Sequence, residues 1–451
     1  MNKKVAYGLL AGALAAACVG ILERTGMAAR WDNPLSDLRA RLLAEKSPAT
    51  DRVKLILVDQ YSLDWISQNM QVKSWPWPRE FYVPILDFLK RHGAKAVVFD
   101  MLYTEPSAFG VADDEALGAA AGRFGNFVGA VFLGKTTAQA TNWPGSVKPN
   151  PIEVQGLAAW LRAHSGPAQE IVSGGAAFPV PELANQVAWL ANVREVPDGD
   201  GVFRRAAPFR IFDGQVLPSL GFAGWLAGLE EKPVKAVLEP TALIAGGQRI
   251  PLDAAGRMIL KFRGKSGTHQ MFNAAEVFRS EMLLQEGGTP PIADGRVFKD
   301  AYVVFGCSAP GLKDLRPSPM GGDYPGPEIY ATMLDNLLAG DFLRDAPVAA
   351  VWVWILLLAL AAGIGAAAAR NGWQSALAAI VLIPLPMLAG IGAWQAGFVL
   401  PVAGASAGVV VALLGGAVVN FVLEGRQKMF IKGAFKHYLS AEVIEQIMRD
   451  P

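Results

Sequence analysis

Four long apolar segments constrain this chain more than any other feature of its sequence. Each is long enough to cross a bilayer, which takes about 20 apolar residues in a helix. The segments are Val5–Leu22, Val348–Ala369, Trp373–Val399 and Leu400–Leu423. A long stretch of ordinary polar content separates the first of them from the other three. The sequence therefore predicts a membrane protein with one span before, and three spans after, one large folded insert.

Basic residues beside these segments predict the orientation of the chain. Lys3 and Lys4 precede the first segment, and Arg370 lies between the second and the third. Four cations follow the last segment: Arg426, Lys428, Lys432 and Lys436. All of them fall on one side if both termini are cytoplasmic, as the positive-inside rule requires. We expect a multi-pass protein of the bacterial inner (cell) membrane whose insert is periplasmic or extracellular.

The first apolar segment has a second interpretation. A Lys-led apolar stretch of small residues that ends near Cys18 is also typical of a secretory signal. Apolar residues continue past Cys18, which favours an uncleaved anchor, but cleavage stays open at this point. The insert is exported in either case. Pro384 and Pro386 lie inside the third segment and predict a kink there.

Composition excludes several classes of protein. The formal charge of +1 leaves no basic excess for binding nucleic acid. Cys18 and Cys307 are too few for a disulfide framework. No acid or base lies within the four apolar cores, which argues against a transporter. No nucleophile elbow, catalytic triad or metal-ligand spacing occurs, so we predict no catalytic residue and no metal site in this chain.

Short apolar runs bounded by turn residues predict a mixed α/β fold for the insert. Val53–Val58 and Ala96–Phe99 have the character of buried strands. Between them, Phe81–Arg91 carries apolar residues at helical spacing and is followed by a glycine. These three elements predict a parallel strand–helix–strand unit with a right-handed connection.

Later segments of the insert predict a second unit and some hairpins. Ala301–Gly306 has the pattern of another buried strand, and the helical pattern of Glu328–Ala339 follows it. The middle of the insert, around Ala188–Ile211 and Arg257–Phe262, has shorter runs that favour antiparallel hairpins. The Asp198–Gly201 run resembles part of a calcium loop but lacks its later oxygen ligands, so a hairpin turn is the better interpretation.

Charged residues at the ends of the predicted strands are candidate ligand-binding residues. Asp59 and Asp100 directly follow the first two strands, and Asp314 follows a glycine-containing loop after a later strand. Ligands of parallel sheets bind at this edge. Arg79 begins the intervening helix and is expected to capture an anion or to pair with Asp59 or Asp100. Structural ion pairs are the alternative for all of these residues.

Two tryptophans complete the candidate site. Trp75 and Trp77 alternate with prolines immediately before Arg79. Tryptophan offers a large apolar face and one hydrogen-bond donor, so the pair is suited to line a ligand pocket. Proline-fixed turns also hold aromatic side chains firmly, so a rigid lid on the core is the other interpretation. The sequence does not choose between them.

Several motifs of the insert carry a family resemblance when taken in order. They are WPWPR at Trp75–Arg79, GAKAVVFD at Gly93–Asp100, PDGDGVFRR at Pro197–Arg205, VVFGCSAPGLKDLRPSP at Val303–Pro319 and YPGPEIYATMLDNLLAG at Tyr324–Gly340. Together they resemble a CHASE-type extracellular sensor domain of the second class. The resemblance implies the input domain of a membrane-bound cyclase or kinase, with one span before it and three after it.

The C-terminal segment resembles a different part of such receptors. Ile431, Phe435 and Tyr438 have helical spacing and are predicted to transmit a signal along one helix face. The final sequence segment, HYLSAEVIEQIMRDP, is similar to the segment that precedes class III adenylate or guanylate cyclase domains. The resemblance implies a homodimer and a catalytic domain beyond Pro451. It implies Mg or Mn and ATP for that domain only, and no cofactor for this chain.

These features together predict an α/β extracytoplasmic sensor domain, four transmembrane α-helices and a cytoplasmic transducer helix. The expected parts are an anchor at 1–22, the sensor at 23–346, three membrane helices at 347–423, and the transducer with the cyclase lead-in at 424–451. The expected function is regulation of adenylate cyclase by an unknown extracytoplasmic ligand or partner protein. Two alternatives stay open: a protein kinase as output, or an anchored exported binding or scaffold protein without catalytic output.

Overall fold

The computed structural model describes residues 3–25, 27–70, 72, 75–134, 140–312 and 314–435, without the side chains of 24, 29 and 425–435. Its internal contacts divide the chain into two compact units. One comprises Ala40–Arg344, and the other combines Met1–Arg39 with Asp345–Pro451. We call them the globular unit and the helical unit. The functional boundaries predicted from the sequence stay predictions.

A mostly parallel sheet forms the centre of the globular unit. Its strands are, in spatial order, β15 (Gln270–Asn273), β1 (Val53–Val58), β16 (Tyr302–Cys307), β2 (Ala96–Phe99), β3 (Phe127–Gly134) and β6 (Gly175–Ala177), and β7 (Trp189–Asn192) also pairs with β3. Every pairing is parallel except that of β6 with β3. The strands β1, β16 and β2 are buried along their whole length, which explains their continuous apolar sequences.

The sheet confirms the predicted strands and shows their order, which the sequence did not predict. β1 and β2 are parallel, as predicted, yet β16 lies between them, with Val304 paired to both Leu55 and Val98. An apolar strand such as β16 is most stable in the interior of a sheet, where its side chains are buried on both faces. The two predicted strand–helix units therefore belong to one sheet.

The predicted hairpins in the middle of the insert are partly wrong. β7 runs parallel to β3 and belongs to the central sheet, because its four residues are all buried. The hairpin prediction holds further on: β9 (Phe209–Phe212) pairs antiparallel with β10 (Gln215–Pro218). β8 (Arg205–Ala206) also pairs antiparallel with β14 (Met258–Ile259), which joins the two predicted segments to each other.

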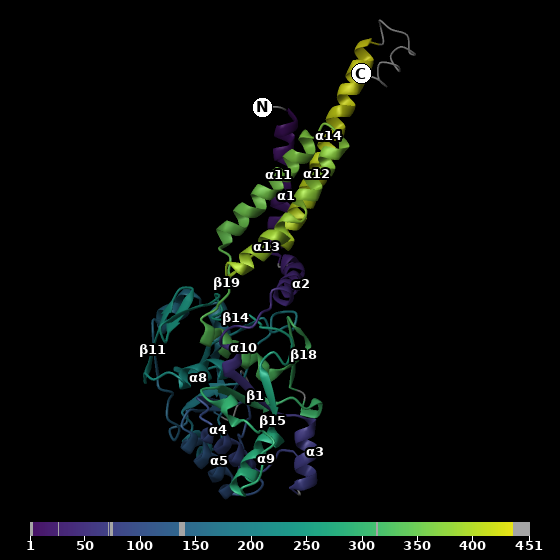
Figure 1. Cartoon of the computed structure of the whole chain (residues 1–451). Coiled ribbons are helices and arrows are strands. Elements are labelled where there is room, and N and C mark those ends of the chain that lie inside the picture. Colours follow the sequence, from purple (N-terminus) through teal and green to yellow (C-terminus); the bar gives the residue numbers. More distant parts are fainter. Residues whose placement is uncertain are drawn as a thin grey trace. The chain divides into compact units, whose positions relative to one another are not determined.

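Helices cover both faces of the central sheet. On one face, α4 (Tyr82–Arg91) contacts α5 (Val111–Phe124) and α9 (Ala274–Gln285), and Figure 1 shows these helices gathered together. Their apolar residues share a core with Phe99 and Phe305, whose rings stack at 4.9 Å. On the opposite face lie α8 (Leu220–Ala227) and α10 (Gly326–Ala339). The Cβ of a residue larger than Gly224 would meet Val98 at 2.4 Å, so glycine allows α8 to approach the sheet closely.

Shorter elements complete the globular unit. A second sheet has the order β13 (Gln248–Pro251), β12 (Ala242–Ala245), β11 (Val234–Glu239) and β4 (Ile152–Gln155). Other elements include α3 (Gln60–Asn69), α6 (Leu157–Ala163), α7 (Pro181–Ala184), β5 (Val172–Ser173), β17 (Leu315–Ser318) and β18 (Gly321–Pro325). The predicted helix before β2 begins as a 3-10 turn at Arg79–Phe81 and continues as α4.

Within the described residues, the helical unit has four segments long and apolar enough to cross a membrane: Lys3–Glu23, Val348–Ala368, Gly372–Gln395 and Ala403–Glu424. The corresponding helices are α1 (Lys3–Arg24), α11 (Val348–Ala368), α12 (Gly372–Leu382) with α13 (Leu385–Gln395), and α14 (Ala403–Phe435). The break between α12 and α13 falls at Pro384, where the kink was predicted. α1, α11 and α14 contact one another, and Gly363 of α11 lies against the backbone of Gly8 in α1.

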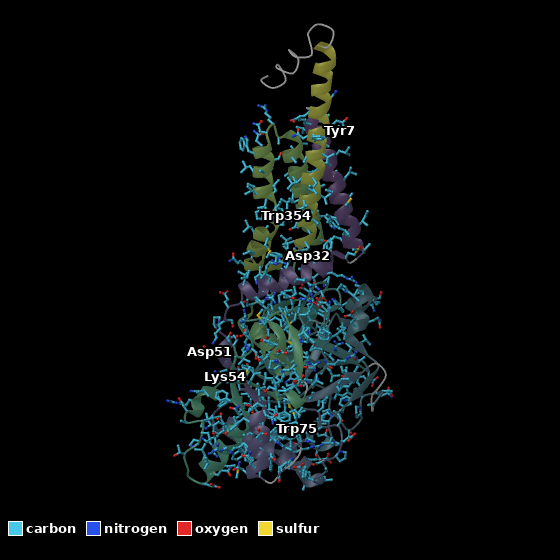
Figure 2. All side chains as sticks on the ribbon, turned by 90° about the vertical axis from the view of Figure 1, so that its right-hand side faces the viewer. Tyr7, Asp32, Asp51, Lys54, Trp75 and Trp354 are labelled. Carbon is cyan, nitrogen blue, oxygen red and sulfur yellow. The ribbon has the colours of Figure 1, made fainter. Side chains whose placement is uncertain are left out.

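A helix that the sequence did not predict, α2 (Met27–Leu42), follows the first span. Asp32, labelled in Figure 2, accepts hydrogen bonds from the backbone N–H groups of Val402 and Ala403, both at 2.7 Å. These groups lie at the start of α14, so Asp32 acts as its N-terminal cap. Arg39 donates to the Leu400 carbonyl at 2.7 Å. Within the helical unit, α2 thus fixes the start of the last span.

Candidate functional site

A cavity of about 330 Å³ opens at the carboxyl ends of the parallel strands, beside the start of α10. We call it the strand-end cavity. Its position fits the rule that ligands of parallel sheets bind where the strands end. Its lining combines three carboxylic acids, one arginine, one tyrosine and apolar residues. These are Asp100, Leu102, Phe132, Val193, Glu195, Phe203, Leu312, Asp314, Arg316, Gly326, Ile329 and Tyr330.

Two of the predicted residues, Asp100 and Asp314, meet in this cavity. Burial raises the pKa of Asp100 well above its usual range, and the nearby Asp314 raises it further. Burial also raises the pKa of Asp314, while Arg316 acts in the opposite direction. Arg316 donates to Asp314 through Nε at 3.2 Å and reaches it through Nη2 at 3.1 Å. The two carboxyl groups therefore resist being ionised together, and one arginine offsets only part of their charge.

Glu195 adds a third acid to the strand-end cavity. Both of its carboxylate oxygens are buried and make no hydrogen bond to a described residue. Burial raises the pKa of Glu195 to about 7, although Arg210 and the backbone N–H of Ala207 act in the opposite direction. The Ala207 N–H does not reach hydrogen-bonding geometry with the carboxylate. A buried carboxylate that accepts no hydrogen bond destabilises the folded state, and such positions are candidates for a functional role.

The first two turns of α10 form one wall of the cavity. The Tyr330 hydroxyl donates to the Val193 carbonyl at 2.7 Å and so joins α10 to the segment after β7. The Asp314 carboxylate lies against Gly326, where a Cβ atom would approach its Oδ1 to 2.4 Å. The backbone N–H of Gly326 donates to the Asp314 carbonyl at 2.9 Å. Glycine at this position allows the helix to begin directly beside the acidic side chain.

The predicted tryptophans lie in a different cavity, of about 510 Å³, which we call the tryptophan cavity. Trp75, labelled in Figure 2, and Trp77 are T-shaped with ring centres 5.5 Å apart. Trp77 is 4% exposed and belongs to the core, whereas Trp75 packs on that core from outside. Arg79 and Tyr103 line the same cavity. The pair therefore both covers the core and borders a cavity, and its role in ligand binding stays a prediction.

Arg79 does not pair with Asp59 or Asp100, so that expectation is wrong. Its guanidinium donates to the Asp114 carboxylate and to the Glu105 carbonyl, and it lies 4.5 Å from the ring centre of Tyr103. The Arg79 and Asp114 side chains are 7% and 2% exposed. The cause is the segment after β2, which folds back so that the start of α5 faces Arg79. Arg79 is already neutralised, and its role in capturing an anion stays a prediction.

Asp59 lies in neither cavity. Its carboxylate accepts a hydrogen bond from the Ser62 backbone N–H at 2.8 Å and so caps α3. It also accepts a hydrogen bond from the Asn273 side chain, at the junction of β15 and α9. Asp59 thus joins the ends of two neighbouring strands. A role of Asp59 in ligand binding stays a prediction.

A buried polar network lies further along α10, which we call the Asp335 network. Asp335 accepts hydrogen bonds from Arg263 at 2.7 Å, Thr50 at 2.6 Å, Ser47 at 2.8 Å and His269 at 3.2 Å. Burial opposes the ionisation of Asp335, but these hydrogen bonds and the Arg263 charge outweigh it and lower its pKa to about 2. The network thus holds the chain at Ser47 and Thr50 against α10.

Sequence reasoning missed Glu195, Arg316 and Tyr330 in the strand-end cavity. Glu195 stands three positions after the buried strand β7, a placement similar to that of Asp100 after β2. A search for acids that follow each buried strand would have found Glu195.

No described group of three or more His, Cys, Asp or Glu side chains is placed to hold a metal ion. Of the predicted transmitting residues, Ile431 and Phe435 lie in the backbone of α14, and Tyr438 lies outside the described residues.

Replacing Glu195 with glutamine is expected to stabilise the protein at pH 8 by about 3 kcal/mol. The folded pKa of about 7 exceeds the ordinary value of 4.5, so the folded state binds more protons between these values. The free energy of unfolding of the unchanged chain therefore falls as the pH rises through this window, and the Glu195→Gln substitution removes that loss. Thermal unfolding of the full chain in detergent at pH 4.5 and pH 8 measures the difference. Equal effects at both pH values, or an equal gain from the exposed control Glu153→Gln, contradict it.

Comparison with known families gives one match. A family model described as the CHASE2 domain matches residues 13–366, which include the whole globular unit, the second half of the first span and most of the second. No curated protein and no solved structure matched the chain.

Proposed function

The chain belongs to the CHASE2 domain family, and from this premise we propose that it senses an extracytoplasmic stimulus and transmits it through its membrane helices. Such a domain is an extracellular sensor of signalling proteins. The mixed α/β fold and the four apolar helical segments fit a membrane-anchored sensor. In our proposal the globular unit receives the stimulus on the outer side of a bacterial inner membrane, and both termini are cytoplasmic.

The observation that carries this proposal is the position of α10. Gly326, Ile329 and Tyr330, near its start, line the strand-end cavity. Asp335, one turn later, binds Ser47 and Thr50, in the segment that leads from the first span. The chain then continues from the end of α10 to the start of α11, the second span. One helix therefore connects the cavity with both chain segments that lead to the membrane.

A stimulus changes the output only if it binds two states of the sensor unequally. α10 is suited to this, because a change at its first turns acts on a rigid element that also holds the Asp335 network. The proposal requires no large movement within the globular unit. A shift of α10 by a fraction of a helical turn would act on both connecting segments together.

We propose further that the output is a class III adenylate cyclase working as a homodimer. Two features support this. α14 continues to Phe435, well past the end of its apolar segment at Glu424, as a helix that transmits a signal would. The sequence HYLSAEVIEQIMRDP resembles the segment that precedes cyclase domains. Mg or Mn and ATP then belong to the catalytic domain. A protein kinase output, or an anchored binding protein without catalytic output, is the alternative.

The output is tested by reading and expressing the native gene. A reading frame that continues after the Pro451 codon into a domain with two metal-binding aspartates supports the cyclase. Expression of that gene in a bacterial host without adenylate cyclase should then restore cyclic AMP. A kinase domain, or a stop codon at this point, overturns the cyclase and favours the corresponding alternative.

The orientation of the chain in the membrane is tested with reporter fusions, in which the reporter follows the whole chain from Met1 to the fusion point. Alkaline phosphatase, which is active only after export, is expected to be active when joined after Leu229 and inactive when joined after Gly372. The reverse pattern would place the globular unit in the cytoplasm and contradict the sensor proposal. Expression levels measured by immunoblot control for unstable fusions.

A further inference from the structure

The charges of the strand-end cavity are unbalanced. Three carboxyl groups, those of Asp100, Glu195 and Asp314, line it together with a single cation, Arg316. Arg316 is bonded to Asp314 and lies 5.7 Å from the ring centre of Phe203. Arg316 is therefore the one described cation of the lining and is engaged with Asp314, while Arg210, outside the lining, offsets part of the charge of Glu195. The cavity favours an added positive charge.

The other polar groups around the cavity give Glu195 no hydrogen bond. Arg210, whose charge acts on Glu195, donates its guanidinium hydrogen bonds to the backbone carbonyls of Arg194, at 3.1 Å, and Glu170, at 2.5 Å. The Tyr330 hydroxyl donates to the Val193 carbonyl. Both oxygens of Glu195 are left buried without a hydrogen-bond donor among the described residues. An unsatisfied buried acceptor in a cavity wall points to a ligand that brings its own donor.

The remaining lining indicates what kind of cation would fit. Apolar side chains form much of the wall, including Leu102, Phe132, Val193, Phe203 and Ile329. The volume of about 330 Å³ equals that of roughly eleven waters at 30 Å³ each. Aromatic rings and alkyl groups suit a hydrocarbon body, and the rings also attract a cation. The described carboxylates form no metal-binding group, so a bare metal ion is a poorer fit than an organic cation.

We propose that the strand-end cavity binds a small organic cation, an ammonium group on a short hydrocarbon body. The ammonium group donates to Glu195 and Asp100, and the hydrocarbon packs against the apolar wall. Asp314 stays paired with Arg316. This inference deepens the proposed function, since it names the class of stimulus for the sensor. Binding is measured on the purified chain without any output, so its failure is distinguishable from failure of the cyclase proposal.

Three probes with similar hydrocarbon chains and different charges test the inference: n-pentylammonium, n-pentanol and pentanoate. Each is titrated into the purified full chain in detergent at pH 7.5, with calorimetry for the Kd and thermal unfolding for the Tm. The expected result is saturable binding and a raised Tm with n-pentylammonium only. No binding of n-pentylammonium, or binding of n-pentanol or pentanoate with similar affinity, overturns the proposal.

Variants locate the bound cation. Glu195→Gln is expected to raise the Kd for n-pentylammonium about tenfold or more, because a charge-assisted hydrogen bond is lost. Asp100→Asn is expected to do the same. The control Asp323→Asn removes an exposed carboxylate on β18 and should leave the Kd unchanged. An unchanged Kd in both Glu195→Gln and Asp100→Asn overturns the assignment of the cation to this cavity.

One residue of the chain could compete with an external cation. Lys313 precedes Asp314 in the sequence and lies outside the described residues. If the Lys313 ammonium group fills the cavity, n-pentylammonium should bind the Lys313→Met variant and not the unchanged chain. That result overturns an external ligand for the native sensor. Binding of similar affinity to both chains supports it.

Discussion

Replacing Asp335 with alanine is expected to lower the free energy of unfolding of the globular unit by about 3–5 kcal/mol. The carboxylate is fully buried and accepts hydrogen bonds from Arg263, His269, Thr50 and Ser47. Among the described residues, alanine leaves the Arg263 guanidinium, which is 1% exposed, with the partly exposed Asp341 as its counter-charge. A fall in Tm of roughly 5–10 °C for the full chain in detergent checks the prediction.

Two variants control for this result. Asp323→Ala removes an exposed carboxylate and should change the Tm by little. Asp335→Asn keeps the shape and part of the hydrogen bonding, so its loss should be intermediate. A loss below about 1 kcal/mol in Asp335→Ala would mean that water replaces the carboxylate and that the network does not hold the chain to α10.

The pH dependence of the same network has a definite sign. The folded pKa of Asp335, about 2, lies below its ordinary value of 3.8. The stabilisation from its charge is therefore complete above about pH 4 and is lost as the pH falls toward 2. Glu195 acts in the opposite direction and at higher pH. Acid unfolding of Asp335→Asn should accordingly show a weaker dependence on pH below 4 than that of the unchanged chain.

Local patterns predicted the elements of this protein well. The buried runs at β1 and β2, the amphipathic pattern of α4 and the proline break in the third span each depend on a few neighbouring residues. Such patterns reflect burial of one face or one strand, which the local sequence records directly. Helix α2 escaped prediction because it contains Pro34, a residue that ordinarily marks the end of a helix.

Arrangement in space could not be predicted in the same way. β16 inserts between β1 and β2 although it follows them by some 200 residues in the chain, and no local pattern specifies that order. The same distance separates Asp100 from Asp314, and Glu195 comes from a third part of the chain. The sequence identified Asp100 and Asp314 singly, by their places after strands. Their meeting in one cavity depends on the strand order, as does the pairing of Arg79 with Asp114.

Replacing Arg79 with leucine is expected to destabilise the globular unit by about 3–5 kcal/mol, because it leaves the buried Asp114 carboxylate without its counter-charge. Leucine keeps much of the apolar stem that packs beside Tyr103, so the loss reports mainly on charge. The neighbouring Asp113 should be less affected by this substitution. Its carboxylate accepts hydrogen bonds from the backbone N–H groups of Arg79 and Glu80, at 2.9 and 2.8 Å, and a leucine at position 79 keeps both. Thermal and denaturant unfolding of the full chain measure the effect.

A double-mutant cycle separates the charge pair from simple packing. Asp114→Asn in the Arg79→Leu background should restore part of the lost stability, because it removes the uncompensated charge while keeping a polar group for the Ser107 backbone N–H. Arg123→Leu, which disturbs an exposed pair with Asp87 at 3.4 Å, should cost less than about 1 kcal/mol. Additive losses in the cycle would show that Arg79 and Asp114 are not coupled. Arg79 would then be available to an anion in the tryptophan cavity, as the sequence alone suggested.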